Sequence, residues 1–189
     1  MSSLPDLAGA GSRRDRFQTL YEENYERLLG YALRRAGRED AADVVAETFL
    51  VAWRRLDEVP TGEEARLWLY GTARRVLANQ QRGDRRRERL AGRVRTHVVH
   101  EVEHGPADSE FEGAAAAFAR LRPDDRELLA LVAWEGLDAG EVARVCGCSR
   151  NAARIRLHRA RRRFARELAR AGRLVKRNPA GGHVSEAYE

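Results

Sequence analysis

The stretch CGCSRNAARIRLHRARRRF, residues 146–164, decides how the C-terminal part of the chain folds. Gly147 separates one helical pattern from another that begins after Ser149. Glycine adopts the left-handed backbone that a tight turn between two helices requires, and the Ser149 hydroxyl is suited to cap the second helix. The stretch therefore predicts a helix-turn-helix unit, with Ala143 and Ala153 as small residues where its helices touch.

The second helix of this unit combines an apolar stripe with a basic face. The apolar positions recur at steps of three and four residues, the period of one helix face, at Ala153, Leu157, Ala160, Phe164 and Leu168. The outward positions are mostly basic: Arg150, Asn151, Arg154, His158, Arg161 and Arg162. The start of such a helix enters the DNA major groove, where arginine pairs with guanine and asparagine with adenine. A basic face can also be merely solvated, but turn, cap, stripe and charge coincide here, so we predict DNA binding.

Cys146 and Cys148 raise the alternative of a metal site beside this basic helix. Zinc needs four ligands in a structural site and three protein ligands in a catalytic one. The two cysteines supply at most two, the chain has no other cysteine, and His158 lies farther along the predicted helix. An unoxidised cysteine behaves as a small apolar group. We therefore interpret both as packing residues of the turn, and predict no metal ligand and no cofactor.

Composition and charge favour a nucleic-acid partner. The 189 residues carry 35 basic and 29 acidic side chains, a net charge of +6. Residues 96–119 contain no arginine or lysine, whereas residues 150–177 are rich in arginine and contain a single acid, Glu167. No apolar run approaches the length of a membrane-spanning helix, about 20 residues, and no apolar signal core follows Arg13 and Arg14. Two cysteines are too few for a disulfide framework, so we expect a cytoplasmic protein that contacts no membrane.

Helical periodicity divides the chain into two parts. Apolar residues recur with a helix period in residues 17–33, 44–56, 64–81, 114–121, 125–135, 138–146 and 149–171. No strand-like alternation is present, so the predicted fold class is all-α. Residues 85–113 are charged, contain Gly and Pro and lack apolar periodicity. We predict two small helical domains, at 15–84 and 114–171, joined by this flexible linker, which holds at most short helical pieces. The ends, 1–14 and 172–189, are predicted to be disordered.

Several stretches together resemble the extracytoplasmic-function group of sigma factors, in the sigma-70 family. FQTLYEENYERLLGYALRRAGREDAADVVAETFLVAWRRL, residues 17–56, is similar to the first half of the family's N-terminal domain. WLYGTARRVLANQQRGDRR, residues 68–86, is similar to its promoter-melting segment, and the stretch that begins with FARLRPDDRELL at Phe118 is similar to its C-terminal domain. The resemblance covers residues 17–83 and 114–169, and the order of the stretches makes it specific.

The resemblance implies a promoter-specificity subunit of bacterial RNA polymerase, without enzymatic chemistry of its own. Such a protein binds the β and β′ subunits of the core polymerase and carries it to promoters. The N-terminal domain would take the −10 element as single-stranded DNA, and the C-terminal domain would read the −35 element as duplex. Many relatives are held by an anti-sigma factor, so an inhibitor of this kind is a further candidate partner.

The resemblance also assigns three sets of contact residues. Binding of the core polymerase falls to one side of the second helix, at Asp43, Val44, Ala46, Glu47, Thr48, Leu50, Val51 and Arg54, with Phe49 and Trp53 in the core on its inward side. Contacts to the −10 strand fall to the loop at residues 59–64 and to Glu64, Trp68, Tyr70, Arg74, Arg75, Asn79 and Arg82. Contacts to the −35 duplex fall to Ser149, Arg150, Asn151, Arg154, Arg156, His158, Arg159, Arg162 and Arg163.

Trp68 is expected to be mainly structural, because aromatic residues at helical spacing are more often core than contact. Arg75 stands where many relatives have asparagine, which changes the expected pocket for the −10 strand. RNAARIRLHRAR stands where the family commonly has GTVKSRLHRAR, so Ala152 and Ala153 replace bulkier residues under the recognition helix.

Two other functions compete with this interpretation. A DNA-binding regulator that does not load on polymerase would keep the helix-turn-helix but would need nothing from residues 43–54. A helical enzyme would need a reactive site, and the sequence contains no phosphate-binding loop, no metal-spaced His, Asp and Glu set and no Ser-His-Asp arrangement. Promoter-dependent transcription with core polymerase would separate the predicted function from both.

Overall fold

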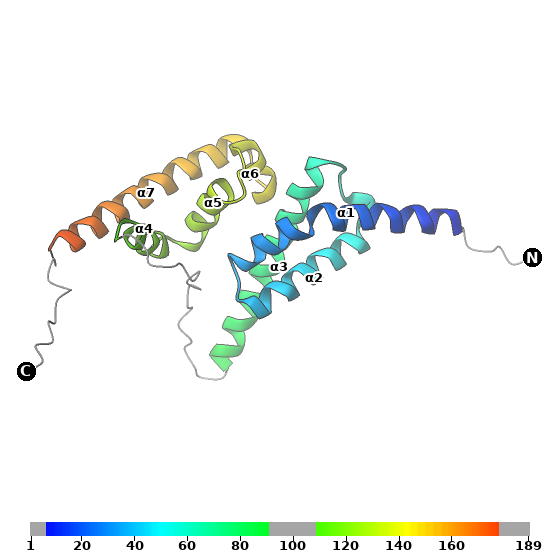
Figure 1. The fold of residues 1–189 in the computed structure, drawn as a ribbon, viewed down its shortest axis with the longest axis horizontal. Helices are drawn as coiled ribbons and strands as arrows, with labels where there is room; N and C mark the ends of the chain where they lie inside the picture. Colours follow the sequence, from blue (N-terminus) through cyan, green and yellow to red (C-terminus); the bar gives the residue numbers. More distant parts are fainter. Residues whose placement is uncertain (1–6, 91–108, 178–189) are drawn as a thin grey trace, which may run out of the picture. The chain divides into compact units, whose positions relative to one another are not determined.

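A computed structural model describes residues 7–90 and 109–177 (Figure 1), and all regular structure in these ranges is helical. The predicted all-α fold class is confirmed. The helices form two compact units. Across the described ranges, every helix is too short or too polar to cross a membrane.

The first unit is a bundle of α1 (Leu7–Leu33), α2 (Arg38–Arg54) and α3 (Glu63–Leu90), with a short 3₁₀ helix, η1 (Leu56–Glu58), before α3. All three α-helices pack against one another. Each turns an apolar stripe inward, and the largest fully buried side chains are Leu28, Tyr31, Val44, Leu56 and Leu69. Phe49 is buried as predicted, and Trp53 is half-buried with its ring 5.1 Å from that of Phe17.

The N-terminal helix starts earlier than the sequence pattern predicts. We predict disorder for residues 1–14, but α1 already begins at Leu7, and residues 1–6 lie outside the described residues. The added turns carry Arg13, which donates a hydrogen bond to the Trp53 carbonyl in the last turn of α2 and also pairs with Asp57. These long-range bonds favour the early start, and apolar periodicity does not reveal them.

The predicted linker, residues 85–113, is helical at both of its described ends. Helix α3 continues through Leu90, and α4 begins at Ser109. In the extension of α3, Arg87 and Asp84 pair at 2.5 Å with the i, i+3 spacing that supports a helix, and arginine is itself a good helix former. Residues 85–90 and 109–113 are thus short helical pieces at the two ends of the predicted linker, while residues 91–108 lie outside the described residues.

The second unit contains α4 (Ser109–Ala119), α5 (Pro123–Ala133) and α7 (Arg150–Arg177), and α6 (Ala139–Cys146) connects α5 to α7 along the chain. Helices α4 and α5 both pack on α7. Pro123 occupies the first turn of α5, where its missing amide hydrogen costs nothing. The buried apolar side chains include Ala117, Leu121, Leu128, Leu131 and Leu157.

The predicted apolar stripe of α7 is confirmed only in its first part. Ala153, Leu157 and Ala160 are buried, but Leu168 is 39% exposed. Because an α-helix turns every 3.6 residues, the stripe drifts past Leu168, and Ala171 is buried farther along. Helix α7 also runs on to Arg177, into the segment predicted to be disordered, and residues 178–189 lie outside the described residues.

Candidate nucleic-acid interface

The turn between α6 and α7 is closed by glycine and capped by serine. Gly147 has a φ of +63°, and its amide and the next one donate to carbonyl oxygens in the last turns of α6, at 3.2 and 2.9 Å. These bonds satisfy carbonyl groups that the end of a helix leaves without partners. The Ser149 hydroxyl accepts a hydrogen bond from the Ala152 amide at 3.2 Å. The predicted turn and cap are confirmed.

The start of α6 is also capped by side chains next to it in sequence. The Asp138 carboxylate accepts from the amides of Gly140 and Glu141, at 2.6 and 2.8 Å, and the Glu141 carboxylate accepts from the Asp138 amide at 2.8 Å. This reciprocal pair is a capping box. Both ends of α6 and the start of α7 are therefore capped by residues adjacent in sequence.

Helix α7 presents a basic face to solvent. The exposed side chains include eight of the predicted −35 contacts: Ser149, Arg150, Asn151, Arg154, Arg156, His158, Arg159 and Arg162. No acidic residue lies in its first turn. The helix N-terminus adds a partial positive charge of its own, so the field at this end attracts polyanions.

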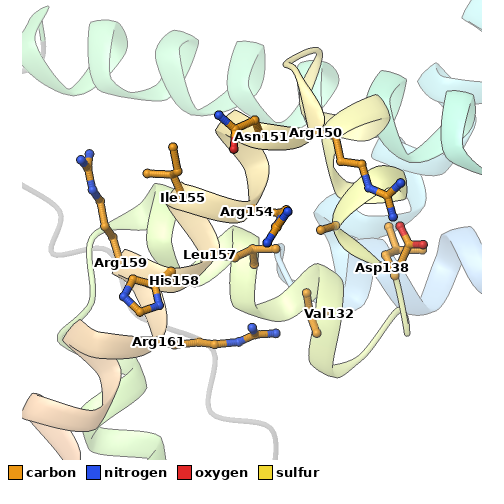
Figure 2. Close-up of a pocket in the computed structure, with 12 residues that line it drawn as sticks. Val132, Asp138, Arg150, Asn151, Arg154, Ile155, Leu157, His158, Arg159 and Arg161 are labelled. Carbon is orange, nitrogen blue, oxygen red and sulfur yellow. The ribbon is translucent and has the colours of Figure 1, made fainter.

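A groove of about 930 Å³ lies beside this face (Figure 2). Val132 and Leu137 contribute from α5 and the segment after it, and the rest of the lining comes mostly from α7. Figure 2 shows Arg161 extending toward Val132, with Asn151 and Ile155 on the outer edge of α7. The basic groups are thus spread over a concave surface as well as along the helix.

Arg163 differs from the other predicted −35 contacts. Its guanidinium donates to both carboxylate oxygens of Asp125, at 2.8 and 2.9 Å, and Asp125 is buried. Arg122 donates to the same carboxylate at 3.2 Å. Because a buried carboxylate needs a cation and hydrogen bonds, Arg163 has a structural role that ties α7 to α5, and the predicted phosphate contact does not fit this geometry.

The predicted −10 contacts on α3 fall into two groups. Glu64, Arg75, Asn79 and Arg82 are exposed, and the Arg82 guanidinium donates to the Asn79 side-chain oxygen. Trp68 and Arg74 are half-buried. Spacings of four, seven, four and three residues place Glu64, Trp68, Arg75, Asn79 and Arg82 along one face of the helix. The predicted −10 contacts other than Tyr70 and Arg74 therefore share one face of α3.

Tyr70 does not belong to this face. It is only 3% exposed, and its ring stacks on that of Tyr31 at 5.0 Å with an interplanar angle of 21°. The prediction of Tyr70 as a −10 contact was wrong, because an aromatic residue at helical spacing serves the core here.

The segment before α3 is held by side chains from α1. Arg13 donates to the Trp53 carbonyl at 2.8 Å and pairs with Asp57 at 3.0 Å, while Arg16 donates to the Val59 carbonyl at 2.6 Å. Neither arginine was predicted to have this role, because spacing and composition carry no signal that pairs them with this segment.

Glycine and a local ion pair complete the same segment. Gly62 has a φ of +60°, a left-handed conformation that few other residues adopt. The Arg55 guanidinium binds the carboxylate of Glu58, and this hydrogen bond lowers the pKa of Glu58 below its usual value. Both partners are exposed, so the pair orders the turn rather than burying charge.

The predicted polymerase contacts on α2 also divide by burial. Asp43, Glu47 and Arg54 are exposed, Val51 is half-buried, and Leu50 is 46% exposed. Val44 and Thr48 are fully buried, and the Thr48 hydroxyl donates to the Val44 carbonyl at 2.6 Å. These two residues pack in the bundle and cannot touch a partner, so their assignment was wrong.

Cys146 and Cys148 are half-buried at the turn. In the part of the chain that the structure describes, His, Cys, Asp and Glu do not gather in groups of three or more as a metal site requires. The packing interpretation of the two cysteines fits their place on either side of Gly147.

Two family models match the chain. Sigma-70 region 2 matches residues 20–87, which cover most of α1 and α3 and all of α2. Sigma-70, region 4 matches residues 113–164, which run from α4 through the helix-turn-helix. Each match therefore falls on one of the two predicted helical domains.

Individual proteins show the same likeness. The ECF RNA polymerase sigma factor BldN of Streptomyces coelicolor is 33% identical over 176 residues, which is 89% of this chain and 66% of that protein. The ECF RNA polymerase sigma factor SigC of Mycobacterium tuberculosis is 31% identical over 160 residues, covering 84% of this chain and 85% of that one. The sigma factor RpoE of Bartonella quintana, solved in complex with the anti-sigma factor NepR, shares the fold with a TM-score of 0.64 and 24% identity, over 81% of this chain and 96% of that chain.

Proposed function

Since the chain belongs to the extracytoplasmic-function sigma factors of the sigma-70 family, we propose that it divides promoter recognition between α3, which takes single-stranded DNA, and α7, which reads duplex DNA. A sigma factor binds the core RNA polymerase and promoter DNA and directs promoter-specific initiation. In this proposal the chain supplies recognition and no catalysis, and it acts in the cytoplasm together with the polymerase.

The observation that carries the proposal is the exposed basic face at the capped start of α7. Arg150, Asn151 and Arg154 lie in its first turns, where a recognition helix meets base edges. Arg159 and Arg162 lie later and suit phosphate groups, which fix position without reading sequence. We assign the −35 duplex to this surface.

Helix α3 suits a different form of DNA. Single strands are held by basic groups that follow the backbone and by aromatic rings that stack on bases. Arg75, Asn79 and Arg82 supply the exposed polar groups, and half-buried Trp68 supplies an aromatic edge on the same face. The left-handed turn at Gly62 immediately before this face gives the loop that would receive an unstacked base. We assign the −10 strand to this surface.

The outer side of α2 is the proposed docking site for the core polymerase. Leu50 is an exposed aliphatic side chain among the charged residues Asp43, Glu47 and Arg54. An apolar centre with a polar rim is typical of protein interfaces. The anti-sigma factor that accompanies the Bartonella quintana relative suggests that a protein inhibitor also exists for this chain.

Run-off transcription by sigma-free core polymerase tests the function directly. The full chain should support initiation at its promoters, whereas core polymerase alone should not. Leu50→Asp should abolish transcription by preventing assembly of the holoenzyme while leaving the helical content unchanged, because the side chain is exposed. If DNA binding persists but no polymerase is recruited by the unaltered chain, the protein is instead a regulator that works without loading on polymerase.

A salt series separates the two kinds of α7 contact. Arg154→Ala in the holoenzyme should weaken binding to the cognate −35 duplex by about 1–3 kcal/mol while hardly changing binding to random duplex. Arg162→Ala should weaken both alike and lower the salt slope by about one unit. Equal losses on both duplexes for Arg154→Ala would remove it from the base-reading set.

A further inference from the structure

Ile155 is an exposed aliphatic side chain on an otherwise polar recognition helix. Its side chain is 44% exposed, and the sequence analysis assigns it no role. The residues on either side of it in sequence, Arg154 and Arg156, are both exposed and basic. Ile155 is therefore an apolar side chain among basic side chains on the exposed face of α7.

The position of Ile155 places it at the centre of the DNA-facing surface. Steps of four, three and four residues put Asn151, Ile155, His158 and Arg162 on one face of α7, and all four are exposed. The buried residues Ala153 and Leu157 lie on the other side of the helix. Ile155 and Asn151 both line the groove beside α7, and Figure 2 shows both on the same stretch of that helix. Its side chain is thus directed at what α7 binds and not at the core.

The chemistry of the major groove offers one good partner for such a group. Base edges there display hydrogen-bond donors and acceptors, and the 5-methyl group of thymine is the one apolar feature among them. Isoleucine cannot form the hydrogen bonds that guanine, adenine or cytosine offers. Burying its methyl groups against a thymine methyl removes apolar surface from water on both sides.

We propose that Ile155 reads a thymine in the −35 element through contact with its 5-methyl group, so that this base pair is selected by an apolar contact between the polar contacts of its neighbours. The inference rests on the assignment of the −35 duplex to α7. Scattered exposed aliphatic residues are common on protein surfaces, so the test must respond to the methyl group itself.

Replacement of thymine by uracil makes that test, because it removes the methyl group and keeps every hydrogen-bonding atom. A bound −35 duplex is first selected from a randomised pool with the holoenzyme, and each thymine on either strand is then replaced in turn. At one position the unaltered holoenzyme should bind the uracil duplex about fourfold more weakly, the change expected for one buried methyl group. With Ile155→Ala, thymine and uracil at that position should bind equally.

Two controls keep the outcome interpretable. Leu168→Ala removes another exposed aliphatic side chain of α7, which is 39% exposed, and should keep the thymine preference unchanged. Ile155→Val should retain most of it. The proposal is overturned if no thymine position responds to uracil, or if Ile155→Ala keeps the full preference. Promoter-dependent run-off transcription is scored in parallel, and its loss in the unaltered protein would overturn the sigma-factor function itself.

Discussion

The segments that lead into α3 and α7 both contain a left-handed glycine, but they are held in different ways. Gly62 has a φ of +60° and Gly147 a φ of +63°. Before α7, the turn is held by its own neighbours, through amide bonds to the end of α6 and the Ser149 cap. Before α3, the local Arg55–Glu58 pair is joined by Arg13 and Arg16, which lie 40 and 43 residues before the carbonyl groups they bind, at Trp53 in the last turn of α2 and at Val59.

The difference has consequences for how each surface responds to change. A locally closed turn forms whenever its own residues are present, so its shape is independent of the rest of the unit. A segment that distant side chains also hold reaches its final shape only after the bundle has formed, so substitutions in α1 should affect the face of α3 that is proposed to bind DNA. We therefore expect substitutions in α1 to change DNA binding by α3. We expect the conformation of the turn before α7 to be insensitive to substitutions elsewhere in its unit.

We expect the strongest effect from a long-range contact of α7, the Arg163–Asp125 pair, which holds the middle of the helix and not its turn. Arg163→Ala leaves the buried Asp125 carboxylate without its main cation, and should destabilise the second unit by about 2–3 kcal/mol. Hydrogen exchange of α5 and α7 measures it. The neighbouring Arg162→Ala should change stability by less than about 0.5 kcal/mol. Unchanged protection combined with weaker DNA binding would restore Arg163 as a phosphate contact.

The next prediction concerns the left-handed glycine in each segment, Gly62 before α3 and Gly147 before α7. Gly62→Ala and Gly147→Ala should each cost about 1–2 kcal/mol, because an L-residue is strained in the left-handed region even though neither site lacks space. Gly83→Ala, a glycine inside α3 with open space around it, is the matched control and should be neutral or stabilising. Urea unfolding of the three variants gives the comparison. Similar stability of all three variants would mean that the left-handed conformation is not required at Gly62 and Gly147.

We expect a smaller effect from removing the hydrogen bond by which Arg16 of α1 holds the segment before α3. Arg16→Ala removes the hydrogen bond to the Val59 carbonyl, which water can partly replace, so we expect a cost of about 1 kcal/mol. The more telling readout is binding of a single-stranded −10 oligonucleotide by the holoenzyme, which should weaken while −35 duplex binding stays the same. Arg14→Ala, an exposed neighbour, controls for the loss of positive charge. If both variants weaken oligonucleotide binding equally, Arg16 acts only through its positive charge and not through its hydrogen bond to the Val59 carbonyl.

The smallest effect concerns the cap of α7. The Ser149 to Ala152 bond is long, at 3.2 Å, so Ser149→Ala should cost about 0.5 kcal/mol, at the low end for an N-cap. Ser149→Asp should preserve stability but repel the DNA backbone. Thermal unfolding and −35 duplex affinity, measured on the same samples, distinguish the two. Equal affinity for the two variants would show that Ser149 stands away from the phosphates.

Sequence patterns predicted the features that depend on neighbouring residues. Gly147, Ser149 and the stripe from Ala153 to Ala160 follow from turn chemistry and a 3.6-residue period, and these are confirmed. The resemblance located the two family regions. The patterns failed where a second element decides: Tyr70 is buried because Tyr31 lies opposite it, and Arg163 is engaged because Asp125 is buried on α5.

The same reasoning explains why Val44 and Thr48 were misassigned. A motif match names a stretch of helix, whereas only the packed bundle shows which side of α2 faces inward. Ile155 was missed for a different reason, because the predicted DNA contacts were chosen among polar and charged side chains, whereas its exposure singles it out. One-dimensional patterns identify the helix, and the partner helices decide which of its faces remains for binding.

The central claim is that α3 binds single-stranded DNA and α7 binds duplex DNA. Its most direct test uses two exposed asparagines, Asn79 on α3 and Asn151 on α7. A photoreactive side chain is placed at either position of the full chain, and the holoenzyme is crosslinked on promoter DNA before and after strand opening. The account predicts that position 151 reacts near −35 in both states, and that position 79 reacts with one strand near −10 only after opening. Reaction of both positions with the same element, or of position 79 with closed duplex alone, would contradict it.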